Sequence, residues 1–78
     1  MSTEALLRQE YLEPLTDREL GILCLLDKDL TNKEIARRLV VTAGTVKVHT
    51  NNVYRKLSVN NRRSAVALSK ALGLLTAD

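Results

Sequence analysis

Cysteine, proline, glycine and aromatic residues are scarce in this sequence, which has no tryptophan, no phenylalanine and only two tyrosines. Its single cysteine, Cys24, excludes an internal disulfide and favours a reducing compartment, so we expect a cytoplasmic protein. Because Cys24 lies in an apolar run, we expect it to be a small core residue. One cysteine and one histidine, His49, cannot form an ordinary zinc site, so no metal is expected.

Motifs that carry chemistry are missing as well. His49 has no nucleophile and no orienting partner at a recognisable spacing, and the chain has no P-loop. We therefore expect no enzyme, no cofactor and no small-molecule ligand in this domain. Two tyrosines are too few for the aromatic platforms on which single-stranded nucleic acids stack. No apolar run approaches the ~20 residues that cross a bilayer, so no membrane partner is expected.

Acidic residues are absent from most of the second half of the chain, where none follows Glu34 until Asp78. Residues 31–63 carry eight cations and one acid, a net charge of +7, whereas residues 1–30 carry three cations and seven acids, a net charge of −4. Solvated helix faces normally interleave both signs to gain ion pairs. A one-sided basic half therefore predicts a polyanionic partner, with nucleic acid as the first candidate.

Four polar residues mark the starts of four expected helices. The 78 residues suffice for one small domain. Thr16 with Glu19 and Thr31 with Glu34 have the spacing of capping boxes. Two further caps, Thr42 and Asn61, predict helices over about 17–28, 32–39, 43–57 and 62–75. No stretch alternates with a period of two, and residues 1–14, which end at Pro14, form a linker or a partly ordered lead-in to a domain over 15–78.

Each expected helix carries an inward apolar stripe, which predicts an all-α fold, a compact four-helix bundle. The stripes contain Ile22, Leu23, Leu26 and Leu30, then Ile35, Ala36 and Leu39, then Val46, Val53 and Leu57, and finally Ala65, Val66, Ser69, Leu72 and Gly73. The fourth helix has a second apolar stripe, which needs a partner. This second stripe consists of Ala67, Leu68, Ala71 and Leu75. We expect it to form a homodimer face, and the alternative is that it packs on an upstream domain or on residues 1–14.

The second and third helices are joined by about three residues, and the third is longer and basic, which is a helix-turn-helix arrangement. Its outward stripe contains Gly44, Lys47, Val48, Asn51 and Arg55. A helix of this kind fits the major groove of double-stranded DNA, where lysine reaches guanine, asparagine pairs with adenine and valine touches a thymine methyl group.

Four short blocks carry a resemblance to a known family: LTDRE at 15–19, TNKEIA at 31–36, TVKVH at 45–49 and NVYRKL at 52–57. Together they resemble the LuxR-type helix-turn-helix domain of bacterial transcription regulators. The resemblance implies a four-helix DNA-binding module whose third helix recognises DNA and whose fourth helix mediates dimer contacts, with RNA polymerase as a further partner. Residues 13–20 also look like the junction in large ATP-binding MalT-like regulators, so we expect the C-terminal domain of a longer protein, with a short stand-alone regulator as the alternative.

The resemblance also implies roles for single residues. Lys47, Val48 and Asn51 match positions that face base edges. Positions matching backbone contacts or the basic end of the recognition helix are Asn32, Lys33, Thr45, His49, Arg55 and Lys56, and we add the basic pair Arg62 and Arg63. Asp29 departs from the family, since a glycine usually ends the first helix there, and it predicts a strained turn or a different helix end.

Two other functions fit parts of the same pattern. Region 4 of sigma factors shares the threonine–arginine–glutamate start and the GluIleAla block, and it binds promoter DNA within polymerase. The run HTNNV at 49–53 fits the LuxR pattern better. A helical protein–protein adaptor is the second alternative, but it gives no reason for excluding acids from residues 35–77.

Overall fold

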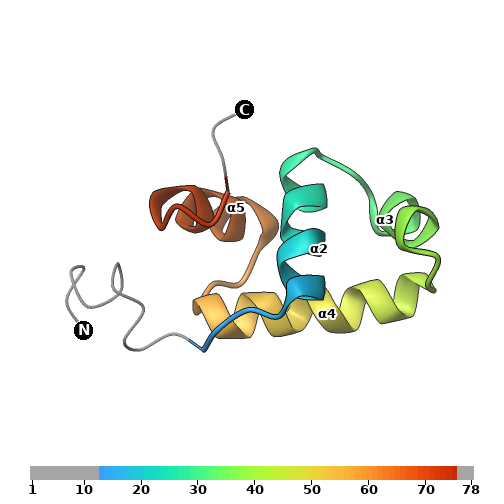
Figure 1. Ribbon diagram of the computed structural model, residues 1–78, viewed down its shortest axis with the longest axis horizontal. Coiled ribbons are helices and arrows are strands. Elements are labelled where there is room, and N and C mark those ends of the chain that lie inside the picture. Colours follow the sequence, from blue (N-terminus) through green and yellow to red (C-terminus); the bar gives the residue numbers. More distant parts are fainter. Residues whose placement is uncertain (1–12, 76–78) are drawn as a thin grey trace.

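The computed structural model describes residues 13–75, while residues 1–12 and 76–78 lie outside the described part (Figure 1). The described residues form four helices and no strand: α2 (Asp17–Asp27), α3 (Asn32–Leu39), α4 (Ala43–Leu57) and α5 (Arg62–Ala71). The expected all-α class is confirmed. Most of the expected lead-in, 1–14, falls outside the described residues.

All four helices begin at the residues that the sequence indicates. The Thr16 hydroxyl accepts from the Glu19 amide at 3.1 Å, and the Glu19 carboxylate accepts from the Thr16 amide at 2.9 Å. Thr31 and Glu34 form the same reciprocal pair, with distances of 3.2 and 2.9 Å. The remaining two N-caps each satisfy one orphan amide, and they are Thr42 and Asn61.

Each helix ends in the same kind of turn, in which one residue adopts left-handed backbone angles. The amide of the residue after the left-handed one then donates to a carbonyl in the last helical turn, as from Val41 to Ala36 at 3.0 Å. The four left-handed residues are Asp29, Val40, Ser58 and Gly73. Because Gly73 turns the chain, α5 ends at Ala71, and the predicted extension of this helix to residue 75 was wrong.

The core lies where α2 crosses α4. Figure 1 shows α3 beside the N-terminal part of α4 and α5 on the other side of α2. In the packing, α4 contacts each of the other three helices, α2 also contacts α5, and α3 packs chiefly on α4. The buried apolar side chains are Ile22, Leu23, Leu26, Ile35, Ala36, Val46, Val53, Leu57, Ala65 and Leu75. The long helix α4 is therefore the element that the rest of the domain holds in place.

Most of the expected core is confirmed, and the exceptions have simple causes. Cys24 is exposed, so the prediction that it is a core residue was wrong. The buried stripe of α2 is formed by Glu19, Ile22, Leu23 and Leu26, and helical spacing places Cys24 on the opposite side. Other expected core residues lie at the edge and are only half-buried, namely Leu30, Leu39, Val66 and Leu72, and Gly73 is exposed.

Candidate nucleic-acid interface

The outer face of α4 carries the three side chains that the sequence places at base edges. Lys47 and Asn51 are exposed, and Val48 is 58% exposed despite being apolar. The opposite face of the same helix is buried through Val46, Thr50, Val53 and Leu57. Because the buried face fixes the rotation of α4, the three exposed side chains form one continuous surface.

The turn between α3 and α4 fixes the angle between these two helices. Val40 occupies the turn with φ at 56° and is 88% exposed, whereas Val41 is half-buried and packs against the core. At the other end of α3, Asn32 and Lys33 are exposed in its first turn, beside its free backbone amides. The N-terminus of α3 thus offers a cation and an amide to an anion near α4.

Two of the expected backbone-contacting residues are half-buried at the side of α4. The Thr45 hydroxyl accepts a hydrogen bond from the Thr42 hydroxyl at 3.0 Å, so this part of the first turn is ordered by its own side chains. His49 lies one turn later and is also half-buried. Both residues border the exposed surface of α4 without forming its centre.

Lys56, which the sequence places among the DNA contacts, is not a free cation, because its charge is engaged in internal bonds. Its ammonium group donates to the Glu19 carboxylate at 2.7 Å and to the Pro14 carbonyl at 3.2 Å. The Lys56 and Glu19 side chains are only 12% and 5% exposed. The pair joins residues 37 positions apart, so no local sequence signal reveals it.

Glu19 serves two partners at once, because its carboxylate also closes the capping box with Thr16. Burial raises the pKa of Glu19, but hydrogen bonds from Lys56 and Thr16 and the charge of Lys56 outweigh this effect. The pKa therefore lies below its ordinary value, and the ionised carboxylate is the stabilising form.

Arg55 keeps the exposure that a DNA contact needs, although it is already paired. Its guanidinium donates to the Glu13 carboxylate at 2.8 Å, and the two side chains are 58% and 60% exposed. The segment before α2 therefore lies against the C-terminal end of α4 through both Glu13 and Pro14.

The neighbouring arginines at the start of α5 differ in their surroundings. Arg62 is half-buried, and its guanidinium donates to the Leu30 carbonyl at 2.5 Å. Arg63 is exposed. Arg63 is therefore free to contact the DNA backbone, as expected. The guanidinium of Arg62 is engaged in an internal hydrogen bond.

The expected dimer face on α5 is smaller than its sequence stripe. Leu75 is 8% exposed and belongs to the core, because the turn at Gly73 folds it inward, so its placement on the dimer face was wrong. Leu68 is half-buried and packs against the core. Ala67 and Ala71 are exposed.

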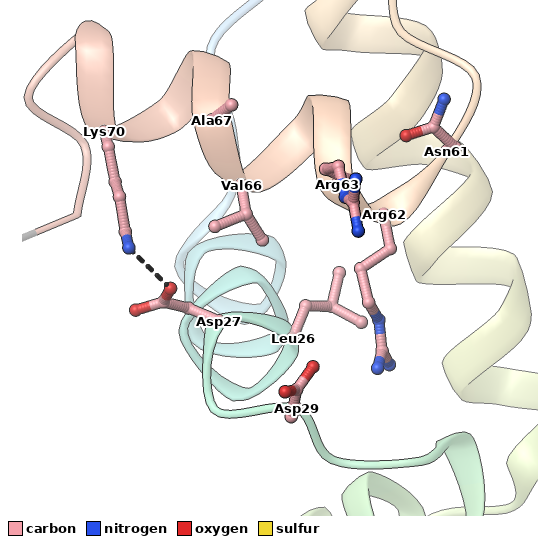
Figure 2. A pocket seen from close by; sticks show the side chains of 9 residues that line it. All are labelled: Leu26, Asp27, Asp29, Asn61, Arg62, Arg63, Val66, Ala67 and Lys70. Carbon is pink, nitrogen blue, oxygen red and sulfur yellow. Dashed lines mark ion pairs between the residues drawn. The ribbon is translucent and has the colours of Figure 1, made fainter.

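A groove of about 630 Å³ runs beside this face, between the end of α2 and α5 (Figure 2). Its charged walls include an ion pair between Lys70 and Asp27 at 3.2 Å. Its lining residues are Leu26, Asp27, Asp29, Asn61, Arg62, Arg63, Val66, Ala67 and Lys70.

Within residues 13–75, no helix is long and apolar enough to cross a bilayer.

Comparison with known proteins places this geometry in a family. Residues 13–69 match the family described as bacterial regulatory proteins, luxR family. Similar proteins include a nitrate/nitrite response regulator protein homolog of Haemophilus influenzae, 47% identical over 57 residues, covering 73% of this chain and 27% of that protein. The transcriptional regulatory protein LiaR of Bacillus subtilis is 51% identical over 53 residues, covering 68% of this chain and 25% of that protein.

A solved structure agrees with the sequence matches. The response regulator ChrA of a heme-sensing two-component system has a TM-score of 0.79 at 32% identity, and the match covers 92% of this chain and 37% of that one. The chain spans about a quarter of the length of the two regulators above. The likeness of residues 13–20 to MalT-like regulators stays a prediction.

The family match covers all four sequence blocks and decides between the LuxR-type reading and sigma-factor region 4. The order of the helices, the short turn after α3 and the exposed face of α4 agree with it. This chain belongs to the luxR family of bacterial regulatory proteins, and residues 13–69 lie in the helix-turn-helix DNA-binding domain of a transcriptional regulator.

Proposed function

We propose that α4 enters the major groove of double-stranded DNA and reads its sequence with Lys47, Val48 and Asn51. The observation that carries this proposal is the exposure of these three side chains on one face, opposite a face fixed by the core. Lysine and asparagine match the donor and acceptor groups of guanine and adenine, and valine matches the thymine methyl group. The exposed Val48 would gain apolar contact with a thymine methyl group in the groove, a contact that water does not offer.

Around this surface, we propose that a second set of residues contacts the DNA backbone and sets the register. Phosphate contacts of this kind carry affinity and orientation but little sequence information. The set excludes Lys56 and Arg62, whose charged groups serve internal bonds. It consists of Asn32, Lys33, Thr45, His49, Arg55 and Arg63.

The partners and setting of the domain are part of the same proposal. Two copies pair on DNA through the exposed face of α5, where the small side chains of Ala67 and Ala71 allow close approach. Such a homodimer places two copies of α4 about 34 Å apart, one turn of the duplex. The domain acts in the cytoplasm beside RNA polymerase, and it binds DNA without catalysis.

The base-reading role is tested by selecting bound sequences from a random duplex pool and then measuring competition between selected and scrambled duplexes. Lys47→Ala and Asn51→Ala should each lower discrimination by about 1–3 kcal/mol, the value of a lost bidentate base contact. Lys28→Ala, which removes an exposed cation from the end of α2, is the matched control and should leave discrimination unchanged. Equal loss for all three variants would show that α4 does not read bases.

Pairing through α5 requires a different test, because a charge at the half-buried Leu68 would disturb the core. Ala67→Glu should remove cooperative binding to a duplex with two half-sites while leaving the affinity for a single half-site nearly unchanged. Cys24→Glu adds the same charge at an exposed position of α2 and should preserve cooperativity. Retained cooperativity in Ala67→Glu would exclude this face of α5 as the dimer surface.

A further inference from the structure

Arg62 connects two parts of the domain that are distant in the sequence. Its guanidinium donates to the carbonyl of Leu30, which directly precedes Thr31, the N-cap of α3. Figure 2 shows the Arg62 side chain running from α5 towards the turn that follows α2. The start of α5 is thereby joined to the start of α3.

This bond adds to the contacts that hold the N-terminal end of α3, where Leu30 also packs against the core. The helix packs chiefly on α4, and its own capping box between Thr31 and Glu34 is exposed. The turn before it contains Asp29 with φ at 63°, a left-handed conformation that an aspartate holds at some cost. A half-buried, charge-assisted hydrogen bond to Leu30 therefore fixes this end of α3 more strongly than the turn alone.

We propose that Arg62 is a positioning residue for DNA binding and does not itself touch DNA. Through the Leu30 carbonyl, it holds the first turn of α3 in the position from which Asn32 and Lys33 contact a phosphate. This inference rests on the proposed function and adds to it the residue that sets the position of one backbone contact.

The adjacent Arg63 offers a matched control, since it has the same charge on the same helix but is exposed. The experiment uses the whole 78-residue chain and compares Arg62→Ala, Arg63→Ala, Lys33→Ala and the double variant of Arg62 and Lys33. Three quantities are measured: the salt dependence of affinity for a fixed duplex, the unfolding temperature, and the amide NMR signals of residues 31–34 without DNA.

For Arg62→Ala, we expect a lower unfolding temperature and shifted amide signals at residues 31–34 in the free protein. The slope of log K against log salt should flatten by about 0.9, one lost phosphate contact. In the Lys33→Ala background, the same substitution should flatten the slope little further. Arg63→Ala should leave the amide signals of residues 31–34 unchanged. Should Arg62→Ala fail to fold, Arg62→Lys keeps a donor and a charge, and the amide signals of residues 31–34 should change in proportion to the loss of affinity.

Two results would overturn the inference. Additive losses for Arg62→Ala and Lys33→Ala, with unchanged amide signals, would mean that Arg62 contacts phosphate directly. A lower unfolding temperature with unchanged affinity and slope, measured well below unfolding, would mean that the bond serves stability alone. If the parent chain itself shows no salt-dependent binding, the proposed function fails, whereas parent-like binding by Arg62→Ala refutes the positioning role only.

Discussion

Within residues 13–75, three residues other than glycine hold left-handed backbone angles at helix ends: Asp29, Val40 and Ser58. For L-residues this conformation crowds Cβ against the following carbonyl, and aspartate relieves part of the cost by local hydrogen bonding. A β-branched residue has no such relief, so Val40 is the most strained of the three. The family resemblance predicts an unusual turn at Asp29, whereas no sequence signal marks Val40 and Ser58 as left-handed.

Val40→Gly should stabilise the domain by about 1 kcal/mol, because glycine adopts left-handed angles without this steric cost. Val40 is 88% exposed, so its removal loses almost no packing. Urea unfolding of both proteins measures the difference. Val40→Ala, which keeps Cβ, is the control and should gain less. A loss of stability in Val40→Gly would show that the valine side chain makes a contact worth more than the strain.

Whether a residue's contacts could be predicted depended on how far apart in the sequence the contacting residues lie. Caps such as Thr31 depend on neighbours three positions away, so the sequence alone located them correctly. The burial of Lys56 and the bond of Arg62 to Leu30 depend on residues more than 30 positions away. The apolar run around Cys24 predicts its burial, but the helical stripe that faces the core excludes this residue, and it is exposed.

Among the elements, α2 and α4 are joined by the buried ion pair between Glu19 and Lys56. The sequence indicated Glu19 as half of a capping box, and the tertiary fold gave it a second partner. The same fold turned the fourth helix back at Gly73, which moved Leu75 from the expected surface into the core. The four helix starts and three of the ends were predictable within one residue from the sequence.

Acidification should weaken the domain through Glu19. Its folded-state pKa lies below the ordinary value of 4.5, so its stabilising effect is complete above pH 4.5 and is lost as the pH falls through the folded pKa. Lys56→Met leaves the buried carboxylate unpaired and should cost about 3 kcal/mol near neutral pH. This cost should shrink below pH 4.5, where the carboxyl becomes neutral.

Urea unfolding of the parent and of Lys56→Met at neutral and at acidic pH measures this difference. Glu34 serves as the internal reference, because hydrogen bonds from Thr31 also lower its pKa and it is intact in both proteins. A cost of Lys56→Met that does not change with pH would contradict the role of the Glu19 charge.

The contact between the segment before α2 and α4 has a measurable consequence for binding. Glu13 occupies the guanidinium of Arg55, which we propose to contact phosphate, so the acid competes with DNA. Both side chains are more than half exposed, and the pair is therefore worth little in free energy. Glu13→Gln should raise duplex affinity by about two- to fivefold, as fluorescence anisotropy measures. In the Arg55→Ala background the same substitution should have no effect, and an equal gain there would exclude competition for Arg55.

On the scale of the whole molecule, the basic half of the chain divides into two groups. Of the eight cations in residues 31–63, Lys56 and Arg62 are committed to internal bonds. The other six are exposed: Lys33, Arg37, Arg38, Lys47, Arg55 and Arg63. The charge pattern predicted a polyanionic partner from the sequence alone, but it could not separate structural cations from available ones, since that division depends on packing.

The salt dependence of duplex binding tests the central claim, that this domain binds DNA through the exposed cations around α4. If the three cations of the proposed backbone set, Lys33, Arg55 and Arg63, meet phosphate and Lys47 adds a fourth contact, log K should fall with log salt at a slope of about −3 to −4. Lys56→Met, at a temperature where it stays folded, should keep that slope, whereas Lys33→Ala should reduce it by about 0.9. A slope near zero between low and physiological salt would contradict the account.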